Sequence, residues 1–162
     1  MIDLEKHKAQ AQQKSNENKD FLAKLKKKKP KDLDDQFHDL HLETFERIDC
    51  LACANCCKTT SPIFYQKDIE RVAKHLKMKV QTFIDTYLRI DEENDYVLKS
   101  SPCPFLDHEN YCMVYESRPT ACREYPHTDR KRMYQIMDLT YKNTIVCPAV
   151  LDIVEQLKKV YK

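Results

Sequence analysis

Eight cysteines in a chain of 162 residues constrain its fold more than any other feature. Four of them lie within eight residues, at Cys50, Cys53, Cys56 and Cys57. The other four follow singly, at Cys103, Cys112, Cys122 and Cys147. Any one of the later cysteines alone could be a small buried side chain. Four clustered thiols are not explained in that way, so the sequence predicts loops tied together by metal ions or by disulfides.

Two CxxC knuckles overlap in the clustered run, and Cys53 belongs to both. Two residues between cysteines let both sulfurs turn toward one ion, which is typical of zinc sites. Three thiolates at this spacing are also what an iron–sulfur cluster takes from one loop. The Cys-Pro pair that closes a ferredoxin run occurs only at a distance, at Cys103-Pro104 and Cys147-Pro148. Both cofactors, a zinc ion and an iron–sulfur cluster, therefore stay open.

Cys56 and Cys57 are adjacent. In an extended segment, neighbouring side chains point to opposite sides, so one ion would not easily take both. The pair predicts either two sites that share a loop, or one ligand beside a thiol that is not a ligand. Eight thiols equal the number that two four-coordinate sites require. We therefore take all eight cysteines as candidate metal ligands.

The chain contains no glycine. A P-loop or a GxGxxG dinucleotide fingerprint is therefore excluded, and positions with positive φ are expected at asparagines. The candidates are Asn55, Asn94, Asn110 and Asn143. The sequence also has no HExxH motif or nucleophile elbow, so it favours a non-enzymatic role without settling the point. Three residues near cysteines are the candidates to complete an open site: Asp107, His108 and His127.

No stretch approaches eighteen apolar residues, and residues 1–13 lack the apolar region of a secretory signal. The expected location is the cytoplasm. Thiols are kept reduced there, which favours metal binding over disulfides.

Residues 1–31 hold ten lysines and four acidic residues, a net charge of +6 against +2 for the whole chain. We expect a basic arm, helical or disordered, that precedes a cysteine-rich metal-binding domain at 32–162. The arm could make a weak nucleic-acid or protein contact through its lysines. The alternative is a solvated, frayed helix without a partner.

Hydrophobic periodicity predicts a small, irregular, helix-rich α+β fold whose loops are stapled by cysteine-bound metal. Helices are expected at 32–48, 67–77, 80–89 and 148–160, with a short one opened by Arg118-Pro119 and ended by Pro126. A short strand or extended lead-in is expected at 63–65 and a short strand at 111–115, with a hairpin formed by 89–91 and 96–99. Residues 132–141 fit neither period.

Three motifs together carry a family resemblance. They are the run Cys50–Cys57, the segment Ser-Pro-Cys103-Pro-Phe-Leu, and the segment from Tyr111 through Arg118-Pro119-Thr-Ala-Cys122 to Pro126. Over roughly residues 48–150 the chain resembles the CxxCxxCC, or YkgJ-type, cysteine cluster proteins, described as candidate zinc- or iron-chelating domains. The resemblance implies metal chelation by the cysteines, and it implies no agreed biochemical role.

The expected function is metal binding that is mainly structural. One alternative is an iron–sulfur electron-transfer or redox protein. A second is a group-transfer enzyme, because flagellin lysine methylases carry a similar cysteine motif. Four thiolates on Zn²⁺ leave a net charge of −2, so Arg118 and Arg123 are expected to supply donors beside the site. Surface salt bridges or an anionic partner are the other roles open to these two arginines.

Overall fold

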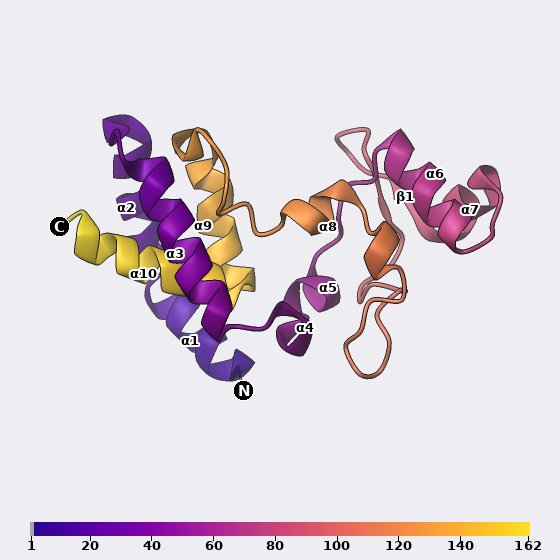
Figure 1. The fold of residues 1–162 in the computed structure, drawn as a ribbon, viewed down its shortest axis with the longest axis horizontal. Helices are drawn as coiled ribbons and strands as arrows, with labels where there is room; N and C mark the ends of the chain where they lie inside the picture. Colours follow the sequence, from indigo (N-terminus) through magenta and orange to yellow (C-terminus); the bar gives the residue numbers. More distant parts are fainter. Residues whose placement is uncertain (1) are drawn as a thin grey trace. The chain divides into compact units, whose positions relative to one another are not determined.

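The computed structural model describes residues 2–162 and confirms the predicted α+β class: helices with one two-stranded antiparallel sheet (Figure 1). Contacts divide the chain into two compact units. The first comprises the chain up to Cys53 together with Pro126–Lys162, and the second comprises Ala54–Tyr125.

The first unit is a helical bundle. Its elements are α1 (Leu4–Gln13), α2 (Ser15–Lys28), α3 (Leu33–Arg47), α4 (Cys50–Cys53), the 3-10 helix η2 (Met133–Ile136), α9 (Met137–Val146) and α10 (Pro148–Val160). Helix α10 packs against α3 and α9, and α2 packs along α9. Phe37, Met137 and Leu157 are fully buried between these helices. The predicted helices at 32–48 and 148–160 are confirmed, and the undecided segment 132–141 forms η2 and the start of α9.

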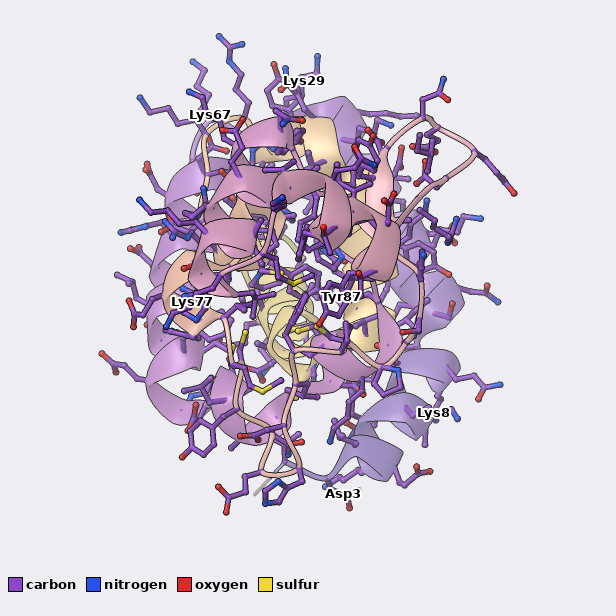
Figure 2. The ribbon with its side chains drawn as sticks, turned by 90° about the vertical axis from the view of Figure 1, so that its right-hand side faces the viewer. Asp3, Lys8, Lys29, Lys67, Lys77 and Tyr87 are labelled. Carbon is purple, nitrogen blue, oxygen red and sulfur yellow. The ribbon has the colours of Figure 1, made fainter. Side chains whose placement is uncertain are left out.

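Residues 1–31 contribute buried side chains to this bundle. Leu22 and Leu25 belong to its apolar core, and the buried His7 lies with Nε2 2.9 Å from the carbonyl oxygen of Thr144. Lysines such as Lys8 remain exposed at the surface (Figure 2). The basic segment thus forms two helices with one buried face. Its division from 32–162 as a separate domain stays a prediction.

The second unit surrounds a small aromatic core. Its elements are α5 (Asn55–Thr59), α6 (Gln66–His75), α7 (Val80–Tyr87), β1 (Leu88–Ile90), β2 (Tyr96–Leu98), the 3-10 helix η1 (Tyr115–Ser117) and α8 (Thr120–Glu124). Strands β1 and β2 form the predicted hairpin, with Leu88 opposite Leu98. The rings of Phe83 and Phe105 stack with centroids 6.2 Å apart. The predicted helices at 67–77 and 80–89, and the short helix after Arg118-Pro119, are also present.

Of the two segments expected to be strands, 63–65 forms the alternative, an extended lead-in: Phe64 pairs with Tyr96 as an isolated bridge, and Tyr65 is extended before α6. The second is wrong. At 111–115, only Cys112 pairs, with Leu106, and the segment then turns into η1. The physical reason is local: Tyr115 donates its N–H to the carbonyl of Cys112 at 3.2 Å, which closes a turn where a strand would continue.

Positive φ angles occur at Asn94 and Asn110, as predicted. Asn55 and Asn143 are helical instead. The other positive-φ residues within 2–162 are Lys29, Ala54, Lys77, His127 and Arg132. The preference of asparagine for positive φ therefore does not identify most of these turns, because five residues of other types also adopt this conformation.

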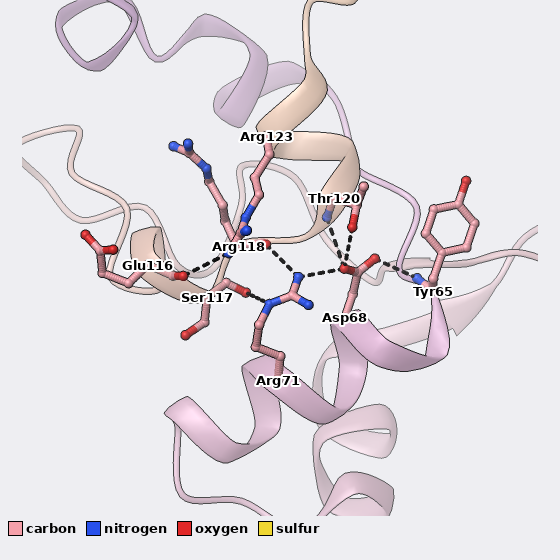
Figure 3. A network of polar contacts seen from close by, with 8 residues as sticks. All are labelled: Tyr65, Asp68, Arg71, Glu116, Ser117, Arg118, Thr120 and Arg123. Atoms are coloured by element: carbon pink, nitrogen blue, oxygen red, sulfur yellow. Dashed lines mark hydrogen bonds and ion pairs between the residues drawn. The ribbon is translucent and has the colours of Figure 1, made fainter.

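A buried carboxylate holds one side of the second unit together (Figure 3). Asp68, in the first turn of α6, is 1% exposed. It accepts hydrogen bonds from the Tyr65 N–H at 3.0 Å and from Arg71 Nη2 at 2.7 Å. It also accepts from both the N–H and the hydroxyl of Thr120, at 3.0 and 2.9 Å. A single side chain thus caps α6 and fastens the start of α8 to it.

Two further α6 side chains reach the segment before α8. Arg71 donates from Nε to the Ser117 carbonyl at 3.2 Å and from Nη2 to the Arg118 carbonyl at 2.9 Å (Figure 3). The Nε2 atom of His75 lies 3.1 Å from the Met113 carbonyl oxygen. We call Asp68, Arg71 and His75 the α6 clamp. The clamp holds residues 113–120 along their length.

The core of the first unit predicts a contrast between two residues of α3. Replacing the fully buried Phe37 with alanine should lower the free energy of unfolding by about 3–5 kcal/mol, because it leaves a cavity. Replacing Leu42, which is 51% exposed, should change it by less than about 0.5 kcal/mol. Urea unfolding followed by circular dichroism measures both. Equal effects would contradict the described packing of α3.

The Asp68 network predicts a pH-dependent contribution to stability. Burial tends to raise the pKa of Asp68, but hydrogen bonds from Tyr65, Arg71 and Thr120 together hold it below its ordinary value of 3.8. The stabilisation is therefore present at neutral pH and is lost as pH falls through the lowered, folded-state pKa. Asp68→Asn should cost about 1–3 kcal/mol at pH 7.

The difference between wild type and Asp68→Asn should shrink as the pH is lowered below 3.8. Urea unfolding of both proteins across this range measures it. A difference that stays constant with pH would show that the carboxylate charge contributes nothing.

Candidate metal centre

The clustered cysteines lie on two short helices, which corrects the expectation of an extended segment. Cys50 and Cys53 begin and end α4, and α5 carries Cys56 and Cys57. Between the helices, Ala54 adopts a left-handed conformation with φ of 49°. Neighbouring side chains on a helix diverge by about 100° rather than pointing to opposite sides. The adjacent pair can therefore interact directly.

The Cys56 and Cys57 side chains are hydrogen-bonded to each other. This hydrogen bond, aided by the charge of Lys58, outweighs the effect of burial and lowers the pKa of Cys57 to about 7. All eight cysteines lie within residues 2–162, and none of them forms a disulfide there. Cys57 thus becomes a thiolate more readily than Cys103, Cys112 or Cys122, whose pKa values are raised.

Four cysteines gather in the second unit. We call Cys57, Cys103, Cys112 and Cys122 the thiol quartet. The Cys103 N–H donates to the Cys57 carbonyl at 2.8 Å, which joins α5 to the turn that follows residue 100. The bridge between Leu106 and Cys112 brings the third cysteine to the same turn. The fourth, Cys122, lies on α8, which the α6 clamp holds.

The quartet members affect one another electrostatically. Burial raises the pKa of Cys103 to about 11 and that of Cys122 to about 12, and the negative charge of Cys57 raises both further. Burial and the same charge also raise the pKa of Cys112. Four neighbouring thiolates are thus unfavourable without a cation. A divalent metal ion would reverse this balance, because it stabilises the deprotonated form of each sulfur that it binds.

A Cys-Pro turn occurs in each unit. In the second unit, the Cys103 sulfur accepts hydrogen bonds from the N–H groups of Phe105 and Leu106. In the first unit, the Cys147 sulfur accepts them from Ala149 and Val150, at the start of α10. The intervening proline has no N–H and a fixed φ that suits the turn. Each turn therefore points two backbone donors at one sulfur, the support that a metal-bound thiolate needs.

Three cysteines gather in the first unit: Cys50, Cys53 and Cys147. Burial raises the pKa of Cys147 to about 12, and the charges of Cys50 and Cys53 raise it further. Cys147 immediately precedes α10, while the other two belong to α4. We call these residues the thiol trio. The trio brings together sulfurs almost a hundred residues apart in sequence.

Across residues 2–162, no three His, Cys, Asp or Glu side chains stand in an arrangement ready to hold a metal ion. The assignment of the eight cysteines as ligands therefore stays a prediction. Asp107 is engaged by its own turn, because Oδ1 accepts the N–H groups of Glu109 and Tyr111 at 2.8 and 2.9 Å. His108 is exposed in the same unit, whereas His127 lies in the first unit with φ of 61°.

The two arginines of the second motif differ in their surroundings. The Arg118 guanidinium lies over the Tyr115 ring at 3.9 Å from its centroid, and its charge lowers the pKa of Cys112 and of Cys122 against the effect of burial. Arg123 is exposed and donates from Nη2 to the Glu116 carbonyl at 3.0 Å (Figure 3). The structure thus distinguishes an arginine beside the thiol quartet from one that faces solvent.

Sequence reasoning did not identify the α6 clamp. Asp68 and Arg71 are three residues apart, at the start of a predicted helix. That spacing is typical of a helix cap and an ion pair. Only the fold shows that Arg71 and Asp68 also hydrogen-bond to Arg118 and Thr120, about fifty residues later in the chain.

The cysteine-rich part of the chain matches a family of known proteins. The model of the CxxCxxCC family, described as "Putative zinc- or iron-chelating domain", matches residues 49–147, which is more than half of the chain. No curated protein and no solved structure matches the chain. Within residues 2–162, no helix combines the length and the apolar character needed to cross a membrane. The matched segment begins just before Cys50, ends at Cys147 and contains all eight cysteines. The chain belongs to the CxxCxxCC family.

Proposed function

We propose that this protein binds zinc through cysteine thiolates and that the metal serves the structure rather than catalysis. The observation that carries the proposal is the gathering of cysteines inside each unit, as the thiol quartet and the thiol trio. Soft thiolate donors suit zinc and iron, and both metals agree with the family description.

The thiol quartet is the proposed closed site. Four thiolates satisfy tetrahedral Zn²⁺ and leave no position for water or substrate, which is typical of structural zinc. The proposed ligands Cys57 and Cys122 come from α5 and α8, and the other two come from the turns between β2 and η1. A metal ion held there would fix loops that have little regular hydrogen bonding of their own.

The thiol trio is the proposed second site. Three thiolates leave one position of a tetrahedral ion for a further ligand. Cys56 is the remaining cysteine of the eight, and we propose it as a metal ligand, without assigning it to the quartet or the trio, because its spacing from Cys53 repeats the CxxC knuckle. Its hydrogen bond with Cys57 is the alternative role, in which it tunes a ligand of the quartet.

An iron–sulfur protein is the second candidate function. The CxxCxxC spacing and the iron in the family description favour it. Electron transfer would then replace a purely structural role. The two candidates differ in colour, because zinc thiolates do not absorb visible light and iron–sulfur clusters do.

The proposed zinc sites predict the metal content of the native protein. Anaerobic purification should yield a colourless protein with about two zinc ions per chain, since eight thiolates fill two tetrahedral sites. Elemental analysis and the visible spectrum measure this. A brown protein with iron and labile sulfide would overturn zinc in favour of the second candidate. A folded protein without metal would contradict both.

The two groups of cysteines predict separable losses of metal. Cys122→Ser and Cys147→Ser should each release about one ion, because each removes a ligand from a different group. Native mass spectrometry of the folded variants counts the ions. Met113→Ser is the matched control, since Met113 is 54% exposed beside Cys112, and it should keep both ions. Loss of both ions from either cysteine variant would indicate one shared site and sink the two-site assignment.

A further inference from the structure

The segment between the last two quartet cysteines is short and tightly held. Cys112 and Cys122 lie at its two ends. The Tyr115 N–H donates to the Cys112 carbonyl at 3.2 Å, and the Cys122 N–H donates to the Pro119 carbonyl at 2.9 Å. Each cysteine thus takes part in a backbone turn with a residue of the segment between them. The α6 clamp binds this segment from the other side, at Met113, Ser117, Arg118 and Thr120.

Arg118 stands at the centre of the segment. Arg71 fixes its backbone by donating to its carbonyl at 2.9 Å (Figure 3). The Tyr115 ring supports its guanidinium at 3.9 Å. The first contact fixes the backbone of Arg118 and the second holds its guanidinium on the ring, so the two together restrict the side chain.

One donor of this side chain is unused. Within residues 2–162, the buried Nε of Arg118 has no hydrogen-bond partner. A buried donor without an acceptor is unfavourable, and buried polar groups in proteins are nearly always hydrogen-bonded. Arg118 lies in the segment that Cys112 and Cys122 bound, and its charge favours the deprotonated form of both thiols against the larger, opposing effect of burial. A thiolate is an acceptor that this donor lacks.

The charge of the proposed metal site also favours a contact between Arg118 and the quartet sulfurs. A Zn²⁺ ion with four thiolates carries a net charge of −2, which is unfavourable in a half-buried setting. A guanidinium beside the sulfurs offsets part of it, and its planar donors can hydrogen-bond to sulfur while its face rests on a tyrosine ring. Lysine would supply the charge but not the planar stacking.

We propose that Arg118 is a positioning residue of the metal site formed by the thiol quartet: it directs a hydrogen bond and a positive charge at the Cys112 and Cys122 sulfurs, and the α6 clamp holds it there. This inference rests on the proposed function and deepens it. It assigns no such role to Arg123, whose guanidinium binds the Glu116 carbonyl.

Anaerobic titration with Co²⁺ tests the proposal, because cobalt bound to thiolates absorbs in the near ultraviolet and visible. The full chain carrying Cys147→Ser isolates the quartet site from the trio. In this background, Arg118→Met should weaken Co²⁺ binding by about 10–100-fold and shift the thiolate-to-cobalt band. Arg118→Lys should restore part of the affinity, because it returns the charge alone. Arg123→Met is the matched control and should change the affinity by less than about twofold.

The results separate two kinds of failure. Equal affinities and spectra for Arg118→Met and Arg123→Met would overturn the role of Arg118 while leaving the metal site intact. Absence of any thiolate-to-cobalt band in the parent protein would overturn the proposed function itself. Urea unfolding of the metal-free variants controls for folding. If Arg118→Met does not fold, the comparison of Arg118→Lys with Arg123→Lys decides, and equal affinities for this pair also overturn the proposal.

Discussion

The second unit depends on one buried carboxylate. Asp68 exchanges contact with water for four hydrogen bonds, and these join a helix that contains no cysteine to a segment bounded by two of them. Buried charges are stable only when they are paired and hydrogen-bonded, and Arg71 meets that condition while binding the same segment through its other donors. The short elements η1 and α8 have few hydrogen bonds of their own, so their placement follows from this network.

The thiolates of the proposed metal sites have the same requirement as the Asp68 carboxylate, because a buried negative charge needs donors or cations beside it. A cluster of half-buried thiols carries little charge, whereas four thiolates on a divalent metal ion carry a net charge of −2 and are tied together by the metal. The charge must then be met by donors. The Cys-Pro turns supply backbone N–H groups at Cys103 and Cys147, and the proposed role of Arg118 would add a side-chain donor for Cys112 and Cys122.

Much of the architecture could be predicted from sequence, because long amphipathic segments such as α3 and α10 show a helical hydrophobic period. The strand at 111–115 was predicted wrongly, and 63–65 could be predicted only as a strand or an extended lead-in, since a short apolar run does not reveal whether a partner strand lies alongside it. The helical setting of Cys56 and Cys57 was also missed, because helices of four or five residues carry too few positions to show a period. The eight cysteines and Arg118 were visible in the sequence. The α6 clamp was not, because its partners are about fifty residues away.

The absence of glycine bears on what holds the turns of this chain in place. Seven residues within 2–162 hold a positive φ without the residue that adopts it freely, and all seven lie outside the helices and strands. For the residues other than asparagine, this conformation is disfavoured by about 1 kcal/mol or more. Ala54, which is 4% exposed, adopts the conformation inside packed surroundings. The stability of such a turn therefore depends on contacts made by the segments that it connects.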